Sequence, residues 1–183
     1  GLNCSLVISM YQAGKVILLS SADGETLTQL PRTFESPMGM AVQDNRLAIA
    51  TRHEIVLMAN DPRLAAAYPN RPNWYDAMYA PRAVFYCGAL FTHDLAFTSD
   101  GLVAVNTLFS CLFRPHAGYS FVPLWQPPFI TALTPDDRCH LNGLALVEGQ
   151  PRYVTALGAT DKPGGWRPDK LKSGVLMDIT TNE

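Results

Sequence analysis

Three segments of the chain repeat one pattern, and this repeat constrains the fold more than any other feature of the sequence. Each segment has a pair of small or polar residues, a short apolar run, a tight turn and a second apolar run. The segments are residues 37–51, 92–107 and 141–156. Ala41, Ala96 and Ala145 form one column of the repeat, and Thr51, Asn106 and Thr155 form a second column at a constant offset. Such columns predict a recurring pair of antiparallel strands.

Further apolar runs of strand length follow each unit, so the repeat extends beyond two strands. They lie at residues 54–58, 111–113, 120–125 and 173–179. An antiparallel meander of three or four strands that recurs every few tens of residues is typical of a propeller blade. A β-sandwich also alternates strands and turns, but it does not require the repeated columns. We therefore expect an all-β, propeller-like chain that contains about three to four blades.

The repeat also predicts how the chain is organised. We expect one propeller-like domain over residues 1–183, with blade units near 1–35, 36–60, 90–126 and 139–181. Residues 61–82 contain four prolines and several aromatic residues, and we expect them to form a long excursion between blades. Long loops are often functional, although packing of the aromatic residues is an equal alternative. Closed propellers have about four to eight blades. The chain is therefore expected to be part of a longer protein or to form a ring with a second copy, unless the repeats are miscounted.

Composition excludes several classes of partner. The formal net charge is −2 and no cluster of Lys and Arg stands out, so we expect no nucleic-acid partner. No apolar run is long enough to cross a bilayer, so we expect no membrane partner. Four cysteines, at positions 4, 87, 111 and 139, show no CxxC spacing, which argues against a zinc ribbon or a thioredoxin-type site. We expect reduced, mostly buried thiols in a cytoplasmic protein, with two disulfides in a secreted protein as the alternative.

Several motifs resemble those of an uncharacterised bacterial family of conserved hypothetical proteins, over nearly the whole chain. They are Tyr-Gln-Ala-Gly-Lys at 11–15, Pro-Met-Gly at 37–39, His-Asp-Leu-Ala at 93–96, Asn-Thr-Leu-Phe-Ser-Cys-Leu at 106–112 and Arg-Cys-His-Leu-Asn-Gly-Leu-Ala at 138–145, together with residues 153–166. Residues 141–145 also resemble the blade start of gluconolactonase-like and strictosidine-synthase-like six-bladed propellers, and residues 37–42 resemble that of NHL-type repeats. The resemblance implies part of a six-bladed-type propeller. Because members of the bacterial family are longer than this chain, it favours a fragment, and it supplies no mechanism.

The gluconolactonase-like resemblance raises the question of a metal. In those propellers an Asn at the blade start helps to hold a divalent cation in the central channel, and Asn142 matches that Asn. The early-blade glutamate of those enzymes has no clear counterpart here, and their late-blade Asp would lie beyond Glu183. The resemblance therefore implies an incomplete site for a divalent cation, calcium or zinc, with Asn142 as its matching ligand. His93, in the same column of the repeat, is the second candidate ligand.

Polar residues gather where the repeat units begin. His93 and Asn142 occupy one column, and Asp94 and His140 flank it. The start of the innermost strand of a blade faces the central channel, so these four side chains are expected to converge there. Imidazole, carboxylate and amide groups suit a divalent cation, and a His–Asp pair can transfer protons. Alternatively, the histidines satisfy backbone groups at blade junctions, and Asp94 and Asn142 cap turns.

Three other features are weaker candidates. Asn106 replaces the Thr of the sister units, which indicates either a nearby site or a hydrogen bond between blades. Residues 158–172 surround Trp166 with four basic side chains, which suits an anionic ligand stacked on the indole; a solvated hairpin loop is the alternative. Cys111 and Cys139 are candidate nucleophiles beside a histidine base, but neighbouring strand residues point to opposite faces, and buried inert thiols are the alternative.

Two classes of function follow from these features. One is a propeller that binds a small-molecule or protein ligand at its channel mouth, with His93, Asp94, Asn106, His140, Asn142 and Trp166 as the binding residues. The other is a metal-dependent hydrolase or lactonase that acts on a small substrate. The missing glutamate favours the binding protein. The sequence does not decide whether the protein is an enzyme.

Overall fold

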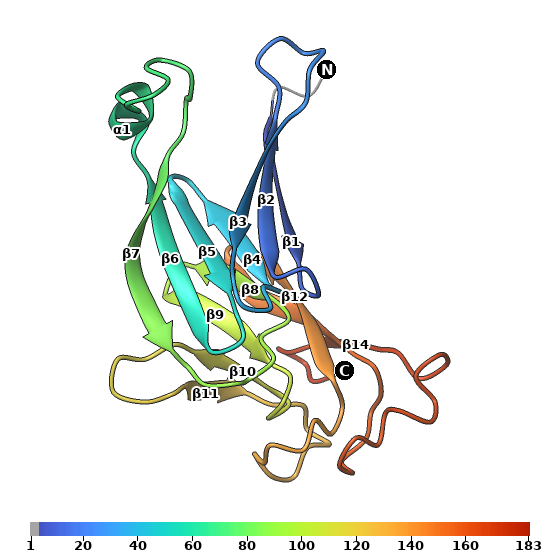
Figure 1. The fold of residues 1–183 in the computed structure, drawn as a ribbon. Coiled ribbons are helices and arrows are strands. Elements are labelled where there is room, and N and C mark those ends of the chain that lie inside the picture. The colour runs from blue at the N-terminus through green and yellow to red at the C-terminus, as the bar shows by residue number, and fades with distance from the viewer. Residues whose placement is uncertain (1–3) are drawn as a thin grey trace.

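The computed structural model describes residues 4–183, and this part of the chain contains fourteen strands and one short helix (Figure 1). The strands are β1 (Leu6–Met10), β2 (Lys15–Ser20), β3 (Thr28–Thr33), β4 (Met40–Gln43), β5 (Arg46–Ala50), β6 (Glu54–Asn60), β7 (Tyr79–Tyr86), β8 (Leu95–Thr98), β9 (Gly101–Asn106), β10 (Cys111–Arg114), β11 (Val122–Trp125), β12 (Leu141–Val147), β13 (Gln150–Ala156) and β14 (Val175–Asp178). The helix is α1 (Pro62–Ala66). The expectation of an all-β chain is confirmed.

The strands form four antiparallel sheets, and within each sheet neighbouring strands follow one another in the chain. The first sheet contains β1–β3, the second β4–β7, the third β8–β11 and the fourth β12–β14, and no sheet closes on itself within the described residues. The three repeat units correspond to the strand pairs β4–β5, β8–β9 and β12–β13. The repeat in the sequence therefore marks the first two strands of three successive meanders.

The first strands of the second, third and fourth sheets lie side by side. β4 contacts β8, and β12 contacts both β8 and β9. The approach is close at Gly39, where an added Cβ atom would lie 2.8 Å from the Cα atom of Asp94. The first two units contain equivalent backbone hydrogen bonds. Ala50 N donates to Gly39 O at 2.8 Å in one unit, and Val105 N donates to Asp94 O at 2.9 Å in the other. Equivalent positions of the repeat thus meet in space.

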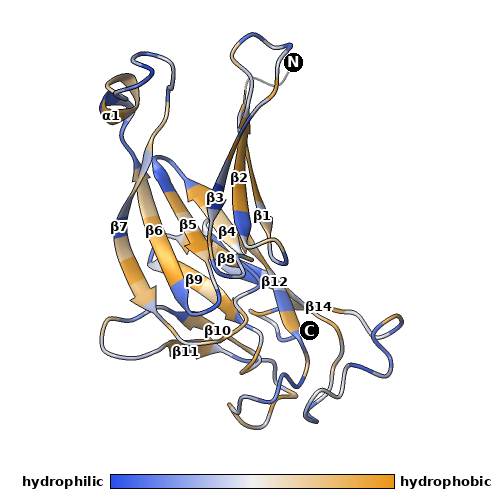
Figure 2. Cartoon of the chain, in the orientation of Figure 1, coloured by the Kyte–Doolittle hydropathy of each residue, from blue (hydrophilic) through white to orange (hydrophobic). Residues whose placement is uncertain are grey.

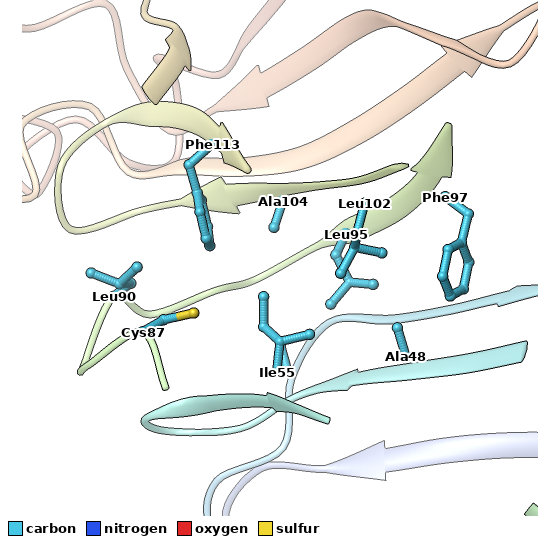
Figure 3. Close-up of a cluster of buried hydrophobic side chains, with 10 residues drawn as sticks. Ala48, Ile55, Cys87, Leu90, Leu95, Phe97, Leu102, Ala104 and Phe113 are labelled. Atoms are coloured by element: carbon cyan, nitrogen blue, oxygen red, sulfur yellow. The ribbon is translucent and has the colours of Figure 1, made fainter. Parts of the chain in front are cut away.

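Apolar side chains fill the spaces between the sheets to different degrees. Ten buried residues form one cluster between the second and third sheets, and Figure 3 shows them converging from both sides. A second cluster of nine buried residues lies between the third and fourth sheets. Between the first and second sheets, the buried cluster found among residues 4–183 has three members, Val16, Leu47 and Ile49. Apolar residues concentrate on the strands and polar residues on the loops, as Figure 2 shows.

The segment between β6 and β7 folds back on itself instead of crossing the molecule. Asp61 caps α1, because its carboxylate accepts hydrogen bonds from the backbone N–H groups of Arg63 at 3.1 Å and Leu64 at 3.4 Å. A backbone hydrogen bond joins the two ends of this segment, since Asp61 N donates to Met78 O at 2.9 Å. The segment contains the short helix α1, and β7 begins at Tyr79, inside the range 61–82 expected for the excursion. In Figure 1 the segment stands beyond the end of the second sheet, opposite the hairpin of the first.

None of the helices in residues 4–183 has the length and apolar character needed to span a membrane.

Candidate functional site

Three of the residues expected from the sequence form one aromatic cluster. His93 precedes β8, His140 precedes β12, and Trp166 lies in the loop between β13 and β14. The ring centroids of His93 and His140 are 4.9 Å apart in an edge-on arrangement, and those of His140 and Trp166 are 4.4 Å apart. The topology therefore brings together side chains that are more than seventy positions apart, as the repeat predicted for the two histidines.

Asp137 holds this cluster in place. Both of its carboxylate oxygens lie 3.0 Å from Nδ1 of His140. Trp166 Nε1 donates to the backbone oxygen of Asp137 at 3.1 Å and to its Oδ2 at 3.2 Å. Arg167 approaches Oδ2 at 3.9 Å and covers the Trp166 ring at 4.7 Å. Sequence reasoning missed Asp137; its position three residues before His140, in a turn rich in polar residues, was the available signal.

Hydrogen bonds fix the orientation of both imidazoles. His93 Nδ1 lies 2.7 Å from Phe91 O and 2.9 Å from Thr107 Oγ1, and the Thr107 hydroxyl donates to Leu141 O at 2.6 Å. Because the hydroxyl hydrogen is used at Leu141, Nδ1 of His93 carries the proton and donates. The carboxylate of Asp137 fixes the same tautomer in His140. Each neutral histidine therefore keeps its lone pair on Nε2.

Burial shifts the pKa values of two site residues, His93 and Asp94. The pKa of His93 lies below its ordinary value, chiefly because burial disfavours the charged imidazolium; the nearby His140 acts in the same direction, and the bond to Phe91 acts against it. The pKa of Asp94 lies above its ordinary value, again chiefly through burial, although two backbone N–H donors oppose the shift. Near neutral pH, His93 is thus a neutral hydrogen-bond acceptor.

Asp94 and Asn142 take different places in the structure. The Asp94 carboxylate accepts hydrogen bonds from Leu95 N at 2.8 Å and Leu144 N at 2.9 Å, so it ties the start of β8 to β12. Asn142 lies on β12 and is half-buried, and its side chain makes no hydrogen bond with the described residues. Asp94 is therefore engaged with the backbone, whereas the amide of Asn142 remains available.

Asn106 is fully buried at the end of β9, with 0% of its surface exposed. Its Oδ1 accepts a hydrogen bond from Phe109 N at 3.0 Å, whereas its Nδ2 has no partner within residues 4–183. Thr51 makes the equivalent bond in the sister unit, accepting from Glu54 N at 3.2 Å. Asn106 thus closes the same turn as Thr51 and also leaves an unsatisfied buried donor.

The backbone around the cluster is unusually bent. Phe91, Ser110, Asp137 and His140 have φ angles of 53°, 56°, 48° and 52°, a left-handed region that residues other than glycine seldom occupy. Such conformations persist only where the surrounding contacts hold them, and they concentrate at functional sites. Phe91 and Asp137 bond the two imidazoles, and His140 carries one of them, so the left-handed backbone helps to orient the pair.

The cysteines near this region are poor nucleophiles. Cys111 and Cys139 are buried free thiols, and burial raises their pKa values to about 12 and about 11. Cys87 is also buried and its pKa is raised to about 11, while Cys4 is exposed. Because the thiolate is the reactive form, these buried thiols are almost entirely protonated near neutral pH.

The residues described do not assemble a complete metal site. Across residues 4–183, the His, Cys, Asp and Glu side chains form no group of three or more that could hold an ion. The Asp94 carboxylate is occupied by backbone donors, and Asp137 is shared between His140 and Trp166. The free donor groups among the predicted ligands are therefore the two imidazole Nε2 atoms, which lie together, and the amide of Asn142 on β12.

Comparison with known proteins identifies a family. A search of curated proteins found no similar sequence. The whole sequence, residues 1–183, matches one family profile. This agrees with the resemblance to an uncharacterised family drawn from the motifs, and it assigns no activity. The chain belongs to the family described as Domain of unknown function (DUF4915).

Proposed function

We propose that the four sheets are consecutive blades of a propeller and that the chain binds a small, hydroxyl-rich molecule where the inner strands begin. Each sheet is a meander in chain order, as in propeller blades. The first strands of three sheets touch, and the equivalent positions Gly39 and Asp94 are so close that a Cβ added at Gly39 would lie 2.8 Å from the Asp94 Cα atom. A ring built this way gathers the start of each inner strand near one axis.

The observation that carries the binding proposal is the fixed tautomer of the imidazole pair. Bonds at Nδ1 to Phe91 O and to the Asp137 carboxylate leave the Nε2 lone pairs of His93 and His140 without a described partner. Two preoriented acceptors suit the O–H donors of a sugar or polyol. The lowered pKa of His93 keeps its acceptor neutral at physiological pH.

The other site residues take supporting roles in this proposal. Trp166 is nine-tenths buried and packs on His140, so it positions that ring instead of stacking on a ligand. Asp94 fixes the two inner strands to each other, and Asn142 offers a free amide on β12, two residues after His140. Asn106 closes the turn after β9, next to Thr107, whose hydroxyl bonds His93. No observation favours the hydrolase alternative, since the buried thiols are protonated and the donor set lacks a third ionisable ligand.

The test is a titration of the protein with a panel of monosaccharides and polyols, followed by calorimetry or ligand-observed NMR. A bound compound should lose about tenfold in affinity when His93 or His140 is replaced by Phe, since each loses one hydrogen bond to the ligand and leaves an unpaired group. Affinity should also fall as the pH drops toward the lowered pKa of His93, because its protonated Nε2 no longer accepts.

His116→Gln is the matched control, because His116 is an exposed histidine outside the cluster. It should leave affinity unchanged. The proposal is wrong if no compound of the panel binds, or if the variants His93→Phe and His140→Phe bind as the unaltered chain does. A zinc titration run in parallel distinguishes the metal alternative, which predicts stoichiometric binding lost in Asn142→Ala.

A further inference from the structure

A second candidate site lies far from the histidines in the chain, between the first and second sheets. A cavity of about 400 Å³ opens there above the small cluster of Val16, Leu47 and Ile49. Binding sites for small molecules have volumes of about 300–1,000 Å³ and mostly apolar walls. The neighbouring spaces between sheets are instead filled by clusters of buried side chains.

The alternation of side chains along the strands builds two of the walls. Leu18 on β2 pairs with Leu30 on β3, and Val16 pairs with Arg32, so these four side chains share one face of the first sheet. They face Leu47 and Ile49 on β5, Met58 on β6, and Tyr79 and Pro81 on β7. Both walls are therefore formed by side chains of paired strands.

The excursion between β6 and β7 supplies the third wall. Ala65 of α1 is buried against the cavity, and Tyr68 and Tyr75 close it with their rings in an edge-on contact at 5.4 Å. Met78 lines the cavity next to the hydrogen bond that pins the base of the excursion. The aromatic residues of this segment thus have a structural role, because two of its tyrosines line the cavity.

The polar groups of the cavity are few, and one is a cation. Arg32 lies on β3 at the rim of the cavity. Its one side-chain hydrogen bond in the described structure is local, since Nη1 donates to Pro31 O at 2.9 Å. The ion pairs of residues 4–183 do not include it. An apolar chamber with one unpaired guanidinium at its mouth is complementary to a molecule with an apolar body and a single anionic head.

We propose that this cavity binds a medium-chain fatty acid, with the hydrocarbon chain against the two sheets and the carboxylate at Arg32. The inference does not depend on the histidine site, since it uses no residue of that cluster. The proposal gives a role to the segment between β6 and β7, which covers the side of the cavity that the two sheets leave open. It also explains why the first sheet turns an apolar face toward a space that its own side chains do not fill.

Calorimetric titration with decanoate and with decanol tests the recognition of the head group. Decanoate should bind, and decanol should bind about tenfold more weakly, because it lacks the charge-assisted bond to Arg32. Arg32→Gln should reduce decanoate affinity about tenfold and leave decanol affinity unchanged. Arg82→Gln, which replaces an exposed Arg on β7 outside the cavity lining, should change neither.

A second variant tests the chamber itself. Leu30→Trp places a bulky ring inside the cavity and should abolish binding of both compounds, whereas Leu27→Trp, at a position 67% exposed in the turn before β3, should leave binding intact. Circular dichroism verifies that both variants fold. The proposal is overturned if unaltered protein binds no decanoate, if decanol binds as tightly as decanoate, or if Leu30→Trp binds normally. Conversion of a dimer to a monomer by Leu30→Trp would assign the face to a second copy and would equally overturn it.

Discussion

The space between the first and second sheets and the space between the second and third are built from the same kind of meander, yet only one of them is filled. Between the second and third sheets, small residues such as Ala48, Ala50 and Ala104 pack with larger ones in a cluster of ten buried residues. Between the first and second, three buried side chains leave a cavity of about 400 Å³. Equivalent architecture therefore gives either a core or a chamber, according to which side chains cross the gap.

The difference arises because the first sheet makes few buried contacts with the rest of the molecule. β3 has the sequence Thr-Gln-Leu-Pro-Arg-Thr and is almost entirely exposed, and Pro31 within it is tolerated because β3 is an edge strand. Only Val16 of this sheet is fully buried. A region with few buried apolar contacts opens at lower free energy than a packed one. The filled space is thus expected to carry the stability, and the open space has freedom to admit a ligand.

The largest expected effect comes from emptying the filled space. Phe113 is fully buried there, in contact with Phe121 at a ring distance of 5.8 Å. Phe113→Ala should lower the free energy of unfolding by about 3–5 kcal/mol, through lost burial and a new cavity. Leu18→Ala, on the wall of the existing chamber, should cost only about 1–2 kcal/mol, because no new void forms. Urea denaturation of both variants measures the difference, and equal losses would contradict the contrast between the two spaces.

A somewhat smaller effect is expected from forcing the inner strands apart. A Cβ at Gly39 would meet the backbone of Asp94 at 2.8–3.0 Å, and backbone atoms cannot move aside as a flexible side chain can. Gly39→Ala should therefore destabilise the fold by about 1–3 kcal/mol. Gly174→Ala is the control, since nothing lies within 4 Å of its added Cβ, and it should change stability by less than about 0.5 kcal/mol. Thermal melts of the two variants should separate clearly; a Gly39→Ala variant as stable as its parent would show that the sheets are not in close contact.

The contrast between contacts inside a repeat and contacts outside it also explains what could be predicted from the sequence. The columns at Ala41 and Asn106 recur with the strands, so the strand pairs and the meeting of His93 with His140 were predictable. Asp137 was missed, because it lies in a turn outside the repeat and its role depends on a left-handed backbone. The chamber was not predictable, because it depends on which side chains fail to meet across two sheets.

Asn106 allows the sister units to be compared directly, with a smaller expected effect. Its Oδ1 closes the turn as the Thr51 hydroxyl does, but its Nδ2 is buried without a partner in the described chain. An unsatisfied buried donor costs about 1–3 kcal/mol, whereas a threonine of similar size would keep the acceptor. Asn106→Thr should therefore raise the free energy of unfolding by about 1 kcal/mol. Chemical denaturation measures this; a loss of stability would indicate that Nδ2 bonds a water or a ligand.

The smallest expected effect is on the pH dependence of the free energy of unfolding. It concerns His93, one of the imidazole pair beside the space between the third and fourth sheets. His93 has an ordinary pKa of about 6.5 in an unfolded chain, and burial lowers its pKa in the fold. Between these two values the unfolded chain binds more protons than the folded chain, so the free energy of unfolding decreases as pH falls from about 6.5. The contribution is complete above that pH and is lost toward the folded pKa.

His93→Phe should remove this part of the pH dependence, because phenylalanine keeps a ring beside His140 and does not titrate. The raised pKa of Asp94 acts in the opposite direction at lower pH, since the folded chain then takes up its proton first. Subtracting the curve of the variant from that of the parent isolates His93, because Asp94 is present in both. Denaturation curves recorded from about pH 8 to pH 5 should show a smaller decline for His93→Phe, while His116→Gln, at an exposed position, should follow the parent. If His93→Phe keeps the full decline, His93 is not the buried neutral acceptor that the binding proposal requires.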